Sequence, residues 1–301
     1  GLVRGDVVTA IDGVSIFGLD PDKALRRVGG PAGTRVRLSI SRFEAPVSIA
    51  RVQFKKPDVL GRMAAPGIGY IFFPQFGDDL DKHVFRKIDE LRAAGARKLI
   101  IDLRFNSGGR LDMAQSIGSE FLPNSDVIVT TKRQGLVAER ALTDGPGRYF
   151  GMPLSIIVNG QSASSSEVLS AALQEQGRAV IVGPEATYGK GSFQQSMQTE
   201  VPRFDEKLQA LNGSRWDGTI LSITDGGWYT PRDRSVEGVY DPATGRNIPA
   251  SGGVKPDAAV AMSADEEKAA MISVLEQLFG AGGSGVKDAA LDKAVEILSR
   301  R

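Results

Sequence analysis

The sequence predicts an α/β fold built around a buried, largely parallel sheet, and three observations lead to this class. Segments with the apolar patterns of strands and helices alternate between residues 68 and 183, as they do in proteins with parallel sheets. The segment 98–104 is apolar on both faces, which is typical of a strand covered by helices on each side. With 301 residues, 41% of them hydrophobic, the chain can bury one large core and a small satellite domain.

The elements of the larger unit, 68–262, are predicted from periodicity and turn residues. Leu80, Val84, Ile88 and Leu91 recur at four-, four- and three-residue steps, which predicts an amphipathic helix over 78–94. Glycine, proline and polar turn residues bound the shorter apolar runs. Strands are expected at 68–73, 98–104, 127–131, 154–158 and 179–183, and helices at 111–122 and 166–176.

Residues 263–301 are expected to form a helical tail. It holds two amphipathic helices, 265–279 and 286–299, joined by a glycine-rich link. Their apolar faces could pack on the core or on a second copy of the chain, so a homo-oligomer formed through the tail is one of two open alternatives.

Residues 1–54 are expected to form a separate small unit. Asp-Gly turn signals flank an apolar run at 7–11, which predicts a strand. Asp20 and Pro21 are typical of a helix start. Alternation of apolar and polar residues over 35–41 predicts a half-buried strand. The proline- and glycine-containing segment 55–67, which follows, is interpreted as a linker.

The composition excludes several classes of function. Lys and Arg total 37 and Asp and Glu total 36, and no basic block indicates a nucleic-acid surface. No apolar run reaches about 18 residues, the length that predicts a membrane span. The chain has no cysteine and one histidine, which excludes Cys–His catalysis and a His/Cys metal site, and no cofactor is expected. His83 falls on the polar face of the 78–94 helix and is interpreted as solvated.

Two short motifs carry the chemistry. Ser162–Glu167 holds four serines at a predicted loop-to-helix junction, and Gly189–Gln194 places Lys190 between two glycines. A serine hydroxyl must lose its proton to attack a carbonyl carbon, and a lysine is the base that this composition leaves available. The lysine motif is not a phosphate-binding loop, because five residues instead of four separate Gly183 from Gly189 and a glycine follows the lysine.

Several motifs occurring in one order identify a family resemblance. They are Ile100–Gly109, Ser162–Glu167, Gln176–Ala179, Tyr188–Gln194, Tyr229–Pro231 and Gly253–Asp257. Over about residues 68–261 the chain resembles the carboxyl-terminal processing, or tail-specific, serine proteases. This resemblance implies a crotonase- and ClpP-like α/β core that works with a Ser/Lys dyad.

The small unit resembles the later part of a bacterial PDZ domain. The resemblance is carried by the segment 1–13, a short helix, Gly33-Thr34 and a strand. The carboxylate-binding loop of a PDZ domain, which holds a peptide by strand addition, would lie before Gly1, so the domain is expected to be incomplete. A small structural β-unit is the alternative.

The resemblance implies which serine attacks. The family run is Ser-Ala-Ser-Ala-Ser-Glu, with its middle serine as the nucleophile. Counting back from Glu167 gives Ser164, whereas the family spacing to Lys190 gives Ser165. We assign Ser164, because an extra residue is accommodated at little cost in the loop 183–188.

The remaining site residues also come from the resemblance. Gln194 is expected to orient the ammonium group of Lys190. The oxyanion hole is expected to use backbone N–H groups of Gly108 or Gly109 and of Ser165. Glu175 stands where the family commonly has Asp, and its role is open. Two insertions relative to the family, 201–219 with Trp216 and 240–247, are expected to be loops that shape substrate entry.

The predicted function is a serine endopeptidase that cuts protein substrates near their C-termini through an acyl-enzyme. A PDZ-type adaptor with an inactive core is the alternative, and Ser164, Lys190 and Gln194 argue against it. A crotonase-like acyl transferase acting on thioesters is a weaker alternative. Protein or peptide substrates are the expected partners, with an adaptor protein as a further candidate. The absence of cysteine suits a periplasmic or otherwise exported protein, with membrane association as a variant of it.

Overall fold

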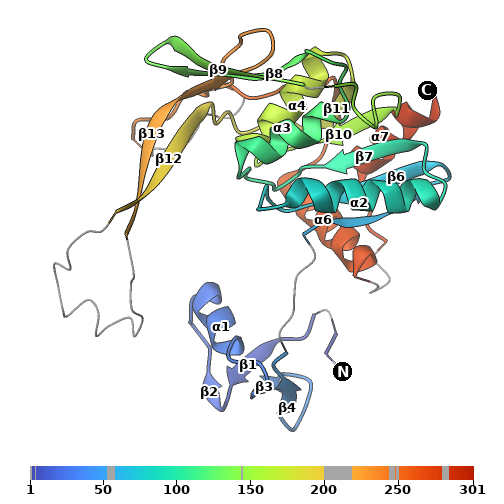
Figure 1. Cartoon of the computed structure of the whole chain (residues 1–301). Helices are drawn as coiled ribbons and strands as arrows, with labels where there is room; N and C mark the ends of the chain where they lie inside the picture. Colours follow the sequence, from blue (N-terminus) through green and yellow to red (C-terminus); the bar gives the residue numbers. More distant parts are fainter. Residues whose placement is uncertain are drawn as a thin grey trace. The chain divides into compact units, whose positions relative to one another are not determined.

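The computed structural model describes residues 2–3, 5–52, 58–143, 145–199, 219–243, 248, 251–279 and 285–301. The chain divides into two compact units, Gly1–Pro57 and Asp58–Arg301 (Figure 1). Apart from Thr219, the predicted insertion at 201–219, which contains Trp216, lies outside the described residues, and so do residues 244–247 of the second insertion.

The smaller unit is a four-stranded antiparallel sheet with one helix. Its elements are β1 (Val8–Ile11), β2 (Val14–Ser15), α1 (Pro21–Val28), β3 (Arg35–Ile40) and β4 (Val47–Ala50), in the sheet order β2-β1-β3-β4. Asp20 Oδ1 accepts the Lys23 N–H at 3.2 Å, so the predicted cap of α1 is confirmed. The predicted alternation along β3 is also confirmed, because Val36, Leu38 and Ile40 are buried in the small core.

A six-stranded sheet forms the centre of the larger unit. Its strands are β5 (Leu60–Ala65), β6 (Ile68–Phe72), β7 (Lys98–Asp102), β10 (Leu154–Ile157), β11 (Ala179–Gly183) and β14 (Ala258–Ala259). Their order is β14-β11-β10-β7-β6-β5, and every pair except β5–β6 is parallel. The predicted parallel sheet is therefore confirmed.

The prediction of a linker over 55–67 is wrong for its second half. Strand β5 occupies Leu60–Ala65 and pairs with β6 in an antiparallel hairpin. The two residues between these strands are Pro66 and Gly67, and Gly67 has φ 74°. Proline and glycine here make a tight turn between strands, a use that composition alone does not distinguish from a linker.

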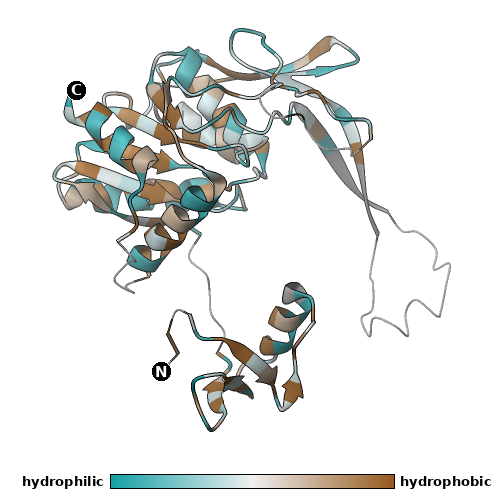
Figure 2. Ribbon diagram, turned by 180° about the vertical axis from the view of Figure 1, so that it is seen from behind, coloured by the Kyte–Doolittle hydropathy of each residue, from teal (hydrophilic) through white to brown (hydrophobic). Residues whose placement is uncertain are grey.

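Helices cover both faces of the central sheet (Figure 1). Helices α2 (Leu80–Ala93), α3 (Leu111–Ser119) and α4 (Ser165–Glu175) pack on one face, and α6 (Ala264–Leu278) and α7 (Ala289–Ser299) on the other. Figure 2 shows these helices with both hydrophobic and hydrophilic segments, as expected where one side meets the sheet. The tail helices thus bury apolar residues against the core, as the first of the two alternatives for their packing expects. No helix in the described ranges has the length and apolar character needed to cross a bilayer.

A second sheet of the larger unit was not predicted as a whole. It consists of β8 (Val127–Arg133), β9 (Leu136–Leu142), β12 (Ser192–Thr199) and β13 (Thr219–Tyr229), all antiparallel, in the order β12-β13-β8-β9. Figure 1 shows β12 and β13 as a long hairpin that extends away from the central sheet. The lysine motif leads directly into β12, so this sheet holds one side of the candidate site.

Candidate active site

The candidate site lies where two neighbouring parallel strands end. The loop after β7 runs through residues 103–110 to α3, and the loop after β10 runs through residues 158–164 to α4. The carboxyl ends of parallel strands are the usual place for a site in such sheets, because the loops that follow them converge there. Hydrogen bonds between the loops confirm that they meet, since the Ala163 N–H donates to Asn106 O at 3.0 Å.

Ser164 occupies the N-cap position of α4 in a strained backbone conformation. Its φ is 54° and its ψ is −116°, a region that costs a non-glycine residue on the order of 1–3 kcal/mol. Its neighbours keep their hydroxyls engaged: Ser165 Oγ donates to Gly109 O and Ser166 Oγ to Asn106 O, each at 2.9 Å. Ser165 and Ser166 are buried, whereas Ser164 is partly exposed. The helix begins at Ser165, one residue before its predicted start, which places Ser164 at the cap.

A buried carboxylate joins the serine motif to the lysine motif. Glu167 Oε2 accepts the N–H groups of Ser164 at 2.7 Å and of Lys190 at 2.8 Å. Glu167 Oε1 accepts the Thr187 hydroxyl and the Gly189 N–H, both at 2.6 Å. Burial raises the pKa of Glu167, and the four donors oppose that rise. This role of Glu167 was not predicted from the sequence, although the Ser-x-x-Glu spacing is that of a capping box, in which the Glu reaches back to the cap N–H.

The backbone of Lys190 is held on both sides. Its N–H is bound by Glu167, and its carbonyl accepts the indole N–H of Trp228 at 2.9 Å. Trp228 is 2% exposed, and its backbone N–H also donates to Gly191 O at 2.8 Å. A Cβ on Gly191 would lie 2.9 Å from the backbone N of Glu237, so only glycine fits beside the lysine. No pattern in the sequence pointed to Trp228, because it approaches the lysine through the distant strand β13.

Three residues close to Lys190 in sequence are at least partly exposed: Tyr188, Phe193 and Gln194. Tyr188 is 38% exposed. The ring of Phe193 lies 6.0 Å from the guanidinium of Arg133, on β8. Gln194 follows a bulge in β12, pairs with Thr224 of β13 and has an exposed side chain.

The two glycines after β7 differ in what their N–H groups bind. The Gly108 N–H donates to Asn106 Oδ1 at 2.9 Å. The N–H groups of Gly109 and Ser165 have no hydrogen-bond partner among the residues that the structure describes. Gly108 instead provides space, because a Cβ on it would lie 2.8 Å from Ser164 Cβ and 3.0 Å from the Ser165 N. The unpaired N–H groups of Gly109 and Ser165 thus belong to residues that flank the close approach of Gly108 to Ser164.

Two other residues singled out in the sequence have structural partners. Glu175, whose role was open, accepts the Arg232 N–H at 2.9 Å and contacts the Arg234 guanidinium at 3.3 Å, and so anchors the turn after β13. His83 Nδ1 lies 2.8 Å from Asp58 Oδ2, and its side chain is 28% exposed. The interpretation of His83 as merely solvated is thus wrong, because the segment before β5 supplies a carboxylate beside it.

Replacing Glu167 with Gln is expected to lower the free energy of unfolding by roughly 1–3 kcal/mol, because either orientation of the amide turns its NH₂ group toward a backbone N–H and leaves that donor unpaired. Urea unfolding measures this change. Glu266 is the matched control, because it occupies the same capping-box position in α6 but is exposed. Glu266→Gln should leave the stability near that of the wild type, since Gln also serves in a capping box. Equal stabilities of the two variants would contradict the bridging role of Glu167.

The sequence is similar to carboxyl-terminal-processing proteases. It is 32% identical to one from Synechocystis sp. over 244 residues, covering 78% of this chain and 53% of the relative. It is 30% identical to one from Bartonella bacilliformis over 246 residues, covering 79% of this chain and 53% of the relative. The chain thus spans about half the length of these curated relatives.

Solved structures share the fold. A photosystem II D1 C-terminal processing protease superposes with a TM-score of 0.51 at 22% identity, covering 86% of this chain and 64% of that one. A protein assigned as an S41 protease from Bacteroides fragilis superposes with a TM-score of 0.58 at 16% identity, covering 99% of this chain and 74% of that one. The model of peptidase family S41 matches residues 67–260, well over half of the sequence. The chain belongs to peptidase family S41.

Proposed function

We propose that this chain is a serine endopeptidase in which Ser164 and Lys190 form the catalytic dyad. The neutral amine of Lys190 takes the proton of Ser164 Oγ as that oxygen attacks the carbonyl carbon of the scissile peptide bond. Gly109 and Ser165 donate their N–H groups to the resulting oxyanion. The tetrahedral intermediate collapses as the leaving amine takes the proton from Lys190, and water then hydrolyses the acyl-enzyme with the lysine again as base.

The observation that carries this proposal is the shared carboxylate oxygen of Glu167. It binds the N–H of Ser164 and the N–H of Lys190, so the two residues are held next to each other although they are distant in sequence. The direction of the serine supports the same role, because its positive φ turns it out of the helix that begins at the next residue. The engaged, buried hydroxyl of Ser165 makes that serine a poor nucleophile.

The substrate class proposed is protein or peptide, cut near the C-terminus. The relatives from Synechocystis and Bartonella carry the description of carboxyl-terminal processing in their names. Within this proposal, the larger unit has a crotonase- and ClpP-like core and the smaller unit is a PDZ-like module. Gln194 orients the lysine ammonium, which a rotation of its exposed side chain would permit.

The proposal extends to location and assembly. An exported, periplasmic protein is proposed because the chain has no cysteine that could mispair in an oxidising compartment. A second copy of the chain is proposed to meet the outer face of α6, where Ile272 and Phe279, the residue that follows the helix, are about half exposed. An adaptor protein is a further proposed partner.

An alkyl fluorophosphonate, which phosphorylates activated serines, tests the proposed function. We expect a covalent adduct on Ser164, located by mass spectrometry of the proteolytic peptides, and loss of the adduct in Lys190→Ala. A peptide with a free carboxyl terminus, digested in parallel, should be cut near that end. Labelling of another serine, or no labelling of the folded protein, would overturn the assignment.

A further inference from the structure

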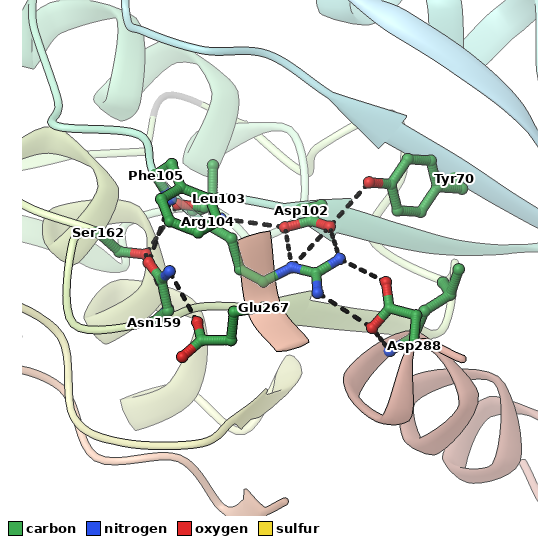
Figure 3. Close-up of polar contacts among 10 residues, drawn as sticks. Tyr70, Asp102, Leu103, Arg104, Phe105, Asn159, Ser162, Glu267 and Asp288 are labelled. Atoms are coloured by element: carbon green, nitrogen blue, oxygen red, sulfur yellow. Dashed lines mark hydrogen bonds and ion pairs between the residues drawn. The ribbon is translucent and has the colours of Figure 1, made fainter. Parts of the chain in front are cut away.

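The tail helices α6 and α7 each place one carboxylate in a polar network with the two active-site loops (Figure 3). These are residues 103–110, the oxyanion loop, and residues 158–164, the nucleophile loop. Glu267 lies in the first turn of α6, and Asp288 is the N-cap residue of α7, where it accepts the Leu291 N–H at 3.1 Å. Glu267 is 6% exposed and Asp288 is 7% exposed. Because carboxylates are rarely buried without partners, the groups that these two bind indicate what the tail holds in place.

Asp288 binds a fully buried arginine at the end of β7. Its two oxygens accept from Arg104 Nη1 at 3.0 Å and from Arg104 Nη2 at 2.8 Å. The same guanidinium donates to Asp102, with Nη2 at 2.6 Å from Oδ2, and the Tyr70 hydroxyl donates to that oxygen at 2.7 Å. The two carboxylates hold the pKa of Arg104 well above its usual value in spite of its burial. The residue after this arginine, Phe105, lies in the same loop as Gly108 and Gly109.

Glu267 binds the amide of Asn159, which in turn holds both active-site loops. Glu267 Oε2 accepts from Asn159 Nδ2 at 2.9 Å. Asn159 Oδ1 accepts the N–H of Phe105 and the N–H of Gln161, each at 3.1 Å. With its NH₂ group on Glu267, the amide of Asn159 must present its oxygen to both loops.

The bond from Phe105 to Asn159 matters because Phe105 is strained. Its φ is 61°, a left-handed conformation that a bulky residue adopts only when its surroundings enforce it. Ser162 connects the same two loops a second time, since its Oγ donates to Leu103 O at 2.7 Å and accepts the Asn159 N–H at 3.0 Å. Ser162 O also accepts the Tyr188 N–H at 2.9 Å, which extends the connection toward Lys190.

We propose that Glu267 is a positioning residue for catalysis: by fixing the amide of Asn159, it holds the nucleophile loop and the oxyanion loop in register. Asp288 plays the same part for the oxyanion loop by holding Arg104. The tail helices are therefore a component of the active site, although neither touches the reacting atoms. The proposal rests on the proposed peptidase function, because it assigns the two carboxylates to that site.

The test replaces Glu267 with Leu, which has a similar size and no acceptor. We expect kcat to fall about 10- to 100-fold while KM stays within about twofold, because a displaced catalytic group loses rate without losing substrate contacts. The thermal midpoint should fall, because the buried Asn159 Nδ2 loses its acceptor, a loss of about 1–3 kcal/mol. A residue with only a structural role would lower the thermal midpoint and leave the kcat of the folded protein unchanged.

Two variants serve as rescue and control. Glu267→Gln keeps an amide oxygen for Asn159 Nδ2 and should restore most of the lost kcat. Lys268→Leu makes the same apolar change at the next, exposed position of α6 and should leave kcat unchanged. If folded Glu267→Leu has the kcat of the wild type, or if Glu267→Gln is as impaired as Glu267→Leu, the positioning role is wrong.

Fluorophosphonate labelling separates this proposal from the proposed function. Labelled wild type with slow labelling of Glu267→Leu supports both. Equal labelling rates of the two proteins refute the positioning role alone, and an unlabelled wild type refutes the function itself. If Glu267→Leu does not fold, Asp288→Asn replaces it, with Asp292→Asn on the exposed side of α7 as control. A kcat of Asp288→Asn equal to that of Asp292→Asn then overturns the proposal.

Discussion

Ser164→Ala is expected to lower peptide hydrolysis by at least about 10³-fold, because it removes the attacking oxygen of the proposed dyad. Lys190→Ala should lower it by a similar factor. The double variant should be no worse than either single variant, since the two residues act as one unit. Initial rates on a casein-like substrate, with circular dichroism as a check of folding, measure these effects.

Ser165→Ala is the matched control for the nucleophile. The hydroxyl of Ser165 donates to Gly109 O inside the protein, so its loss removes one internal hydrogen bond, about 1 kcal/mol of stability. Its backbone N–H, the group proposed for the oxyanion hole, is unchanged. Hydrolysis should therefore stay close to the wild-type rate. An inactive Ser165→Ala beside an active Ser164→Ala would place the nucleophile one residue later, and normal rates in all three single variants would refute the peptidase.

Gly108→Ala is expected to lower kcat by roughly 10²–10³-fold, the size of effect seen when an oxyanion hole is damaged. The added methyl group would lie 2.7 Å from Ala163 O and 2.8 Å from Ser164 Cβ. Since both atoms are close to the helix cap, the nucleophile or the oxyanion loop must shift. Steady-state kinetics should show the change in kcat more than in KM.

Gly135→Ala separates crowding from backbone strain. Gly108 has φ 97° and Gly135, in the β8–β9 turn, has φ 79°, so alanine is strained at both positions. A methyl group on Gly135 meets no atom within 4 Å, whereas one on Gly108 enters the site. Gly135→Ala should lose some stability and keep its kcat. Equal loss of kcat in both variants would mean that space beside Ser164 is not what Gly108 provides.

Local pattern was enough to predict most of the central sheet and its helices. Strand 179–183 and helix α2 follow from apolar runs and steps of three and four residues, which report burial of nearby side chains. The second sheet was missed in part because its pairing is not local. Strand β8 pairs with β13 nearly a hundred residues later, and no periodicity within either strand encodes that partner.

The candidate site divides in the same way. Ordered motifs pointed to Ser164 and Lys190 because a short run of residue types is itself the signature of this chemistry. They did not distinguish Gly108 from Gly109 as an N–H donor, which depends on whether Asn106 Oδ1 occupies the donor. The sequence showed Glu167 only as the last residue of a capping box, since three of its four donors lie outside that box, in residues 187–190.

The class of fold, its main elements and the serine and lysine motifs of the proposed dyad can therefore be read from the chain, because each depends on neighbouring residues. Which serine hydroxyl is open, which N–H is free and where the tail packs depend on the folded protein. Asp288 and Arg104 are 184 residues apart, yet the guanidinium is buried against that carboxylate. Burial and hydrogen-bond partners of this kind are set by segments that meet only after folding, and no local sequence pattern records them.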